Sequence, residues 1–218
     1  MRNSTGYKKS FYGYFCALTI LMLLFAGCEK RPIKNIQAQG STIICFGDSI
    51  TFGYGVERGE DYPAALAKIL GRPVLNQGID GDTAEQAFAR FQSDVLDRNP
   101  SLVILEFGGN DFLENVPLST TINTLRKMVQ LAQAKGALVA VADVSAGLFM
   151  LEYRFALRKL AADEGALFIP ELLKGIITNP SLKSEFLHPN KEGYQLIAER
   201  VSAVIQPYLS HHLQSAKK

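Results

Sequence analysis

A serine that follows an apolar run early in the chain is a candidate nucleophile. Ser49 lies in the segment Gly-Asp-Ser-Ile-Thr (residues 47–51), directly after the predicted strand Thr42–Phe46. In an open α/β sheet, ligands bind beyond the carboxyl ends of the strands. A serine at this edge can present its hydroxyl to a cleft while nearby backbone N–H groups point toward it. A serine after a strand is also a common helix N-cap, so Ser49 alone does not separate the two roles.

Histidine is the side chain that most often activates a serine near neutral pH, and this sequence contains three. His211 and His212 lie in a polar C-terminal tail and are expected to be solvated. His188, which precedes the last predicted helix, is therefore the only credible base if the protein is a serine hydrolase. Glu185 lies three residues before it and can orient the imidazole, although on its own it reads as a solvated surface acid.

Two segments that follow other predicted strands contain groups suited to binding an oxyanion. Residues 76–81 read Asn-Gln-Gly-Ile-Asp-Gly, and the glycines permit a close approach of the backbone. Residues 108–111 read Gly-Gly-Asn-Asp, where a side-chain amide stands beside flexible backbone. Such an amide can donate to developing negative charge. Each segment taken alone is equally compatible with an ordinary turn.

Short apolar runs alternate with amphipathic segments along the chain. The predicted strands are Thr42–Phe46, Pro73–Asn76, Leu102–Phe107, Leu138–Ala142 and Leu167–Ile169. The predicted helices are Tyr62–Leu70, Thr83–Asp97, Ser119–Ala134, Leu151–Glu164 and Asn190–Tyr208. Three strands are nearly continuous in Val, Ile and Leu, as expected for strands covered on both faces. Asp82 and Glu85 predict a capping box for the second helix. The alternation predicts one α/β domain with a parallel sheet between helices.

Composition excludes several classes of protein. The 218 residues are 47% hydrophobic and 20% charged, which excludes a disordered chain, and a net charge of +2 favours no nucleic-acid partner. Three cysteines cannot form a framework of two or more disulfides. The dinucleotide-binding spacing of glycines is not matched by Gly53, Gly55 and Gly59. A metal site is not indicated either, because no second histidine lies near His188 in the sequence. We expect neither a metal nor a cofactor.

The first 27 residues have the layout of a secretory signal, with a basic start and an uncharged run up to Gly27. Ala26-Gly27-Cys28 resembles the lipobox of bacterial lipoproteins, in which the cysteine is lipidated and becomes the first mature residue. The resemblance predicts a lipid anchor at Cys28 and a place in the bacterial cell envelope, on a membrane facing the periplasm. A plain signal peptide and an uncleaved anchor are the alternatives.

The remaining chain divides into three predicted parts. Residues 28–40 are expected to form a polar tether, residues 41–210 the folded domain and residues 211–218 a polar tail. Cys16 falls in the segment that processing would remove. Cys45 would then be the remaining free thiol, and its apolar surroundings favour a buried structural role over a reactive one.

Four blocks in order resemble the SGNH, or GDSL, hydrolase superfamily. They are Gly47-Asp48-Ser49, Gly78, Gly108-Gly109-Asn110-Asp111 and His188-Pro189-Asn190. The resemblance spans residues 42–207. The segments Gly81-Asp82-Thr83 and Glu106 to Asp111 are most similar to the corresponding sequences of the periplasmic thioesterase, arylesterase and lysophospholipase branch. The resemblance implies a flavodoxin-like three-layer α/β/α sandwich with a parallel five-stranded sheet.

The same resemblance implies a role for each matching residue. Ser49 would be the nucleophile and His188 the base. The backbone N–H groups of Ser49 and Gly78, together with the Asn110 side chain, would form the oxyanion hole. The family usually has an aspartate three residues before the histidine, where this chain has Glu185. Glutamate serves as the triad acid in other serine hydrolases, and we assign Glu185 this role.

The implied activity is hydrolysis of carboxylic esters, thioesters or lysophospholipids through an acyl-enzyme. The partners would be an acyl-ester substrate and, through Cys28, a membrane; no oligomeric state is predicted. Two alternatives are an envelope polysaccharide O-deacetylase and a non-catalytic lipid- or glycan-binding lipoprotein on the same scaffold. Residues 144–151 either line an acyl site or belong to the core at a helix start. Asp111 is interpreted as structural.

Overall fold

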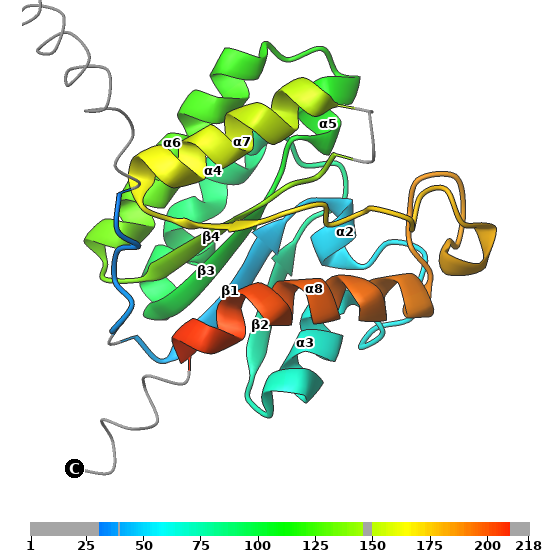
Figure 1. Cartoon of the computed structure of the whole chain (residues 1–218), viewed down its shortest axis with the longest axis horizontal. Coiled ribbons are helices and arrows are strands. Elements are labelled where there is room, and N and C mark those ends of the chain that lie inside the picture. Colours follow the sequence, from blue (N-terminus) through cyan, green and yellow to red (C-terminus); the bar gives the residue numbers. More distant parts are fainter. Residues whose placement is uncertain (1–30, 39, 146–149, 210–218) are drawn as a thin grey trace, which may run out of the picture. The chain divides into compact units, whose positions relative to one another are not determined.

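In the part of the chain that the computed structural model describes, residues 31–38, 40–145 and 150–209, five parallel strands form one sheet. The strands are β1 (Thr42–Gly47), β2 (Val74–Gly78), β3 (Pro100–Glu106), β4 (Leu138–Ala142) and β5 (Leu167–Ile169). Their order across the sheet, β2-β1-β3-β4-β5, is the flavodoxin-like order. Helices lie on both sides of the sheet (Figure 1), so the predicted three-layer sandwich is confirmed.

The helices divide between the two faces of the sheet. They are α2 (Ser49–Phe52), α3 (Tyr62–Leu70), α4 (Ala84–Asp94), α5 (Gly109–Leu113), α6 (Leu118–Ala134), α7 (Leu151–Glu164) and α8 (Lys191–Leu209), with 3-10 turns η1 (Leu96–Arg98) and η2 (Pro180–Leu182). α3 and α8 cover one face, and α4, α6 and α7 cover the other. Successive side chains of a strand point to opposite faces. Ile43 and Cys45 therefore pack beneath α3 and α8, whereas Ile44 and Phe46 pack beneath the other three helices.

Cys45 is fully buried in β1, as the sequence predicted for a structural cysteine. Its burial raises the pKa of the thiol far above the ordinary value, and a hydrogen bond with Tyr62 only partly opposes this effect. Because the thiolate is the reactive form, this cysteine is chemically inert in the folded protein.

The second predicted helix differs from the observed one at both ends. α4 ends at Asp94, and the backbone breaks at Val95 before η1 begins. The capping box is formed by Thr83 and Gln86, so the prediction of Asp82 and Glu85 was wrong. The reason is that the Asp82 carboxylate pairs with Arg90 at 2.7 Å instead of capping the helix.

Two short helices that the sequence analysis did not predict begin where strands end. α2 follows β1 directly, and α5 follows β3. β2 also runs two residues further than predicted, to Gly78, which pairs in register with Gly47. α2, α5 and the end of β2 therefore lie at the same edge of the sheet. The candidate site residues lie at this edge.

Part of the segment predicted as a tether is folded against the domain. The Lys34 N–H donates to the Gly165 carbonyl at 2.9 Å, and the Asn35 side chain donates to the carbonyls of Gln133 and Ala137, each at 2.9 Å. Ala38 is buried. Folded structure therefore begins before residue 41, and the predicted free tether is shortened accordingly.

The predicted signal peptide at 1–27, the lipobox cysteine Cys28 and the predicted tail at 211–218 lie outside the described residues. Within the described residues, no helix has the length and apolar character that a membrane span requires.

Candidate active site

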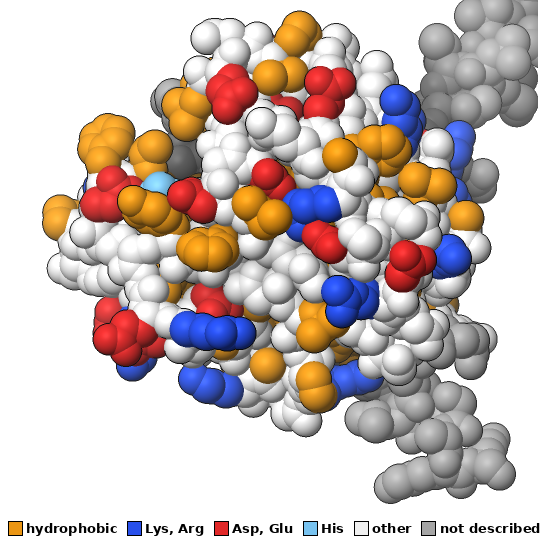
Figure 2. All heavy atoms as spheres, turned by 180° about the vertical axis from the view of Figure 1, so that it is seen from behind, with side chains coloured by type: hydrophobic (Ala, Val, Ile, Leu, Met, Phe, Trp, Pro, Cys, Tyr) orange, Lys and Arg blue, Asp and Glu red, His pale blue; other side chains and the backbone are white. Residues whose placement is uncertain are grey.

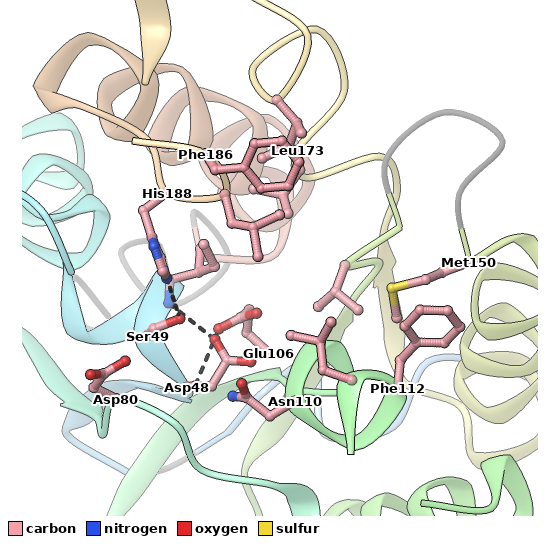
Figure 3. A pocket seen from close by; sticks show the side chains of 16 residues that line it. Asp48, Ser49, Asp80, Glu106, Asn110, Phe112, Met150, Leu173, Phe186 and His188 are labelled. Atoms are coloured by element: carbon pink, nitrogen blue, oxygen red, sulfur yellow. Dashed lines mark hydrogen bonds between the residues drawn. The ribbon is translucent and has the colours of Figure 1, made fainter. Parts of the chain in front are cut away.

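Ser49 and His188 lie next to each other (Figure 3), and Glu185 contacts His188, so the three predicted triad residues are brought together. Ser49 is the first residue of α2, and Asp48, not Ser49, is the N-cap, because the Asp48 carboxylate accepts from the Ile50 N–H at 3.0 Å. The Ser49 hydroxyl is thus left for other partners. His188 Nε2 lies 2.9 Å from Ser49 Oγ, and His188 Nδ1 hydrogen-bonds to the Glu185 carboxylate.

The loop that holds His188 is closed by backbone hydrogen bonds before α8 begins. The Ser184 N–H donates to the His188 carbonyl at 3.0 Å, and Lys183 and Pro189 form an isolated bridge. The ring of Tyr54 lies over the imidazole with centroids 4.5 Å apart. These contacts hold the imidazole in reach of α2.

Glu185 occupies the position where the family usually has an aspartate, and its longer side chain folds back within the loop. Its carboxylate contacts His188 Nδ1 and also accepts from the Leu187 N–H at 3.3 Å. The hydrogen bond with His188 is the main cause that lowers the pKa of Glu185. The carboxylate is therefore ionised at neutral pH and can hold the imidazole in the tautomer that exposes Nε2 to the serine.

Gly78 is not placed to donate to an oxyanion, which corrects the sequence prediction. Its N–H donates to Asn76 Oδ1 at 2.9 Å, and it borders a separate hollow formed with Phe52 and Gly53. A glycine is needed here for a packing reason, because a Cβ atom would lie 2.1 Å from the Phe52 nitrogen. Gly78 thus brings β2 close to α2.

Gly81 is better placed than Gly78 to donate its backbone N–H to an oxyanion. It has a positive φ of 81°, and its N–H has no hydrogen-bond acceptor among the described residues. The residues on either side reach the site, since Asp80 lines the cavity and the Asp82 carbonyl accepts from Asn110 Nδ2 at 3.0 Å. The Ser49 N–H likewise has no acceptor in the described structure. Gly81 begins the segment 81–83, so the resemblance to the thioesterase branch contained a signal for it.

A cavity of about 270 Å³ opens beside Ser49 and His188. Figure 2 shows hydrophobic side chains (orange) around the histidine side chain (pale blue). Most of the cavity lining is apolar and consists of Ile50, Phe112, Leu113, Val144, Met150, Leu173, Ile177, Phe186 and Leu187. Val144 and Met150 come from the segment 144–151, which therefore does contribute to the cavity; Leu148 and Phe149 of that segment lie outside the described residues. The sequence analysis did not single out the contributions of α5 and of the loop before His188. An apolar cavity of this kind accommodates a hydrocarbon chain.

Two buried acids, Asp48 and Glu106, lie close to Ser49, and the sequence analysis gave neither a role. Glu106 Oε2 accepts from the Asp48 N–H at 3.3 Å and from the Thr51 hydroxyl at 2.8 Å. Burial is the main cause that raises the pKa of Asp48 to about 7 and that of Glu106 well above its usual range. Repulsion from Asp48 raises the pKa of Glu106 further. The pair therefore retains a proton that two exposed carboxyl groups would lose.

Replacing Glu106 with glutamine is expected to weaken the pH dependence of stability between about pH 4 and pH 7. Because the pKa of Asp48 is raised from 3.8 to about 7 and that of Glu106 well above its usual range, the folded protein binds more protons than the unfolded chain in this window, and Glu106 contributes part of the difference. The free energy of unfolding therefore falls as the pH rises through it. Glutamine can accept the same two hydrogen bonds and removes one acid of the pair. Urea unfolding at a series of pH values measures the slope, and an unchanged slope in Glu106→Gln would contradict the prediction.

Asp111, next to Asn110, joins three helices. Its buried carboxylate accepts from the Ala84 N–H at 3.0 Å and from the Thr121 hydroxyl at 2.8 Å. These contacts connect α5 to the first residue of α4 and to α6, which agrees with the structural interpretation. They also fix the position of α5, which carries Asn110. Among the described residues, no group of three or more His, Cys, Asp or Glu side chains is arranged to hold a metal ion.

The site and its fold have counterparts in known proteins. The model of the GDSL-like Lipase/Acylhydrolase family matches residues 45–196. The chain belongs to this family. Esterase TesA of Pseudomonas aeruginosa is 27% identical over 198 residues, which are 86% of this chain and 98% of that protein. A crystal structure of TesA superposes with a TM-score of 0.71 at 27% identity, over 77% of this chain and 99% of that one. The uncharacterized lipoprotein YqeF of Bacillus subtilis is 38% identical over 106 residues, 45% of this chain and 40% of that protein.

Proposed function

We propose that this member of the family is a serine hydrolase that cleaves carboxylic esters through an acyl-enzyme. The observation that carries the proposal is the continuous contact from Glu185 through His188 to Ser49 Oγ, with 2.9 Å between His188 Nε2 and the hydroxyl, where Ser49 and His188 line a largely apolar cavity. A nucleophile, a base within hydrogen-bond reach and a group that orients the base are the parts that nucleophilic acyl transfer requires.

The proposed reaction has two steps. His188 Nε2 takes the Ser49 proton as the serine oxygen attacks the acyl carbonyl, and the same imidazole then protonates the departing alcohol or thiol. Water, activated by His188, attacks the acyl-enzyme and releases the carboxylic acid. The carbonyl oxygen, negatively charged in each tetrahedral intermediate, would be held by the N–H groups of Ser49 and Gly81 and by Asn110 Nδ2. Asn110 Nδ2 donates to the Asp82 carbonyl at 3.0 Å, so it would exchange that partner for the substrate oxygen.

The cavity favours longer acyl chains over the short acetyl group. Its apolar lining lies next to Ser49, where the acyl carbon must be held for attack. A polysaccharide O-deacetylase would need room and hydrogen-bond partners for sugar hydroxyl groups, and it would leave this apolar surface unused. The hydrogen bond between Ser49 and His188 argues against a purely lipid- or glycan-binding lipoprotein, because binding alone requires no base beside Ser49. Aryl esters, thioesters and lysophospholipids all supply acyl chains of the kind that the cavity suits.

A series of p-nitrophenyl esters tests the proposed substrate class. Each methylene that the cavity buries contributes about 0.8 kcal/mol, or roughly a fourfold increase in kcat/KM. We therefore expect kcat/KM to rise from acetyl to butyryl to hexanoyl and then to level off once the cavity is filled. Acetylated xylan measured in parallel is expected to be a poor substrate. Preference for the acetyl ester and rapid release of acetate from the polysaccharide would contradict the assignment.

We further propose that the protein is exported and anchored by lipid at Cys28 to a membrane of the bacterial envelope. The resemblance of residues 26–28 to a lipobox supports this, as does the similarity to a protein named as a lipoprotein. Metabolic labelling with a fatty-acid analogue tests it: label is expected in the wild-type protein and not in Cys28→Ser, and equal labelling of the two would overturn it.

A further inference from the structure

Asp80, in the loop after β2, is an acidic residue of the active-site cavity that has no partner among the residues that the structure describes. It lines the cavity together with Ser49, Asn110 and His188. Its carboxylate is exposed and makes no hydrogen bond or ion pair with any described residue. Asp82, two residues further on, differs in this respect, because Arg90 pairs with it at 2.7 Å. The charge of Asp80 is therefore left to act on whatever enters the cavity.

The described lining of the cavity contains three acidic side chains, those of Asp48, Asp80 and Glu106. No lysine or arginine is found among the described residues that line it. Asp48 and Glu106 lie close to Ser49 but are buried. Asp80 is the exposed one of these three acids, so it is the one that a substrate group can approach from solvent.

The position of Asp80 relative to the apolar lining indicates which part of a substrate it meets. In the close view, Phe112 and Met150 lie on one side of Ser49, and Asp80 lies on the other (Figure 3). An acyl chain in the apolar part places the scissile carbonyl at Ser49. The leaving group must then extend away from Phe112 and Met150, within reach of His188, which has to protonate it. That direction leads toward Asp80.

We propose that Asp80 selects the leaving group, favouring esters of cationic alcohols, such as those that carry a quaternary ammonium, over anionic ones. The inference rests on the proposed ester hydrolysis and adds to it the charge class of the alcohol. A carboxylate attracts a positive leaving group and repels a negative one. Two unit charges about 4 Å apart in water interact by an energy equivalent to roughly a fivefold change in rate. The expected preference is therefore roughly fivefold for the cation over a neutral group of the same shape.

Three esters with one acyl chain and different alcohols test the proposal. They are butyrylcholine, its uncharged carbon isostere 3,3-dimethylbutyl butyrate and the anionic ester of butyric acid with 2-hydroxyethanesulfonate. In the wild-type protein kcat/KM is expected to follow the order cationic, neutral, anionic. Asp80→Asn keeps the shape of the side chain and removes its charge, so its three values are expected to converge. Raising the ionic strength is expected to reduce the wild-type preference, because salt screens exposed charges.

Glu199→Gln is the matched control. It removes one negative charge from the exposed face of α8, outside the cavity lining, and should keep the wild-type preference. Neutral-ester hydrolysis in which the cationic ester has no advantage, or in which Asp80→Asn keeps the wild-type preference, would overturn the role of Asp80 and leave the proposed function intact. If the wild-type protein hydrolyses none of the three esters, the proposed function itself fails and this inference fails with it.

Discussion

Replacing Ser49 with alanine is expected to lower kcat for ester hydrolysis by about 10⁶-fold, because the reaction then has no nucleophile for the acyl group. The loss should come without unfolding. Ser49 is N1 of α2, whose N-terminus is capped by Asp48, and alanine is well tolerated at such a position. Initial rates on p-nitrophenyl hexanoate and thermal unfolding of both proteins measure the two quantities.

Ser93→Ala provides the control for the Ser49 experiment. Ser93 is an exposed serine on α4 whose hydroxyl donates to the Arg90 carbonyl, away from the cavity. Its removal is expected to leave kcat within about twofold of wild type, as surface substitutions usually change little. If Ser49→Ala kept more than a few per cent of the wild-type activity, another residue would have to be the nucleophile.

Replacing His188 with alanine is expected to cause a loss of similar size, about 10⁶-fold in kcat. Without the imidazole no group accepts the Ser49 proton, and the Glu185 carboxylate loses the partner that lowers its pKa. The two residues act as one unit, so the double variant Ser49→Ala/His188→Ala should be no slower than either single variant. Kinetics of the wild type, the two single variants and the double variant make the test.

The size of the double-variant effect decides whether the two residues cooperate. If the losses from Ser49→Ala and His188→Ala multiplied, the residues would contribute independently, and the 2.9 Å contact between them would have no catalytic meaning. Tyr54→Phe is a suitable control, because it retains the ring that packs on the imidazole and removes only a hydroxyl.

The framework of the fold was predictable from sequence because burial on both faces leaves a strong pattern. β4 was predicted with its observed bounds, since all five of its residues are apolar and buried. β2 was predicted too short, because it is an edge strand that ends in Asn-Gln-Gly, none of which favours a strand. α2 and α5 are too short for a helical periodicity to be recognised at all.

The candidate triad was also predictable, since so few residues could fill each role. The backbone donors to an oxyanion and the buried acids near the triad were not predictable. Two glycines in residues 76–81 fit an oxyanion site equally well by type. The structure separates them because the Asn76 side chain occupies the N–H of Gly78, a contact that no spacing reveals. Glu106 ends an apolar run, and only the register that pairs it with Gly47 shows that it lies beneath Asp48.

Covalent labelling by a fluorophosphonate tests the central claim most directly, because this reagent reacts with a serine only where a base and an oxyanion site activate it. The account predicts that the wild-type protein gains the mass of one adduct, that peptide mapping places the adduct on Ser49, and that Ser49→Ala gains none. Absence of an adduct on the folded wild-type protein, or equal labelling of Ser49→Ala, would contradict the assignment of this site as a serine hydrolase.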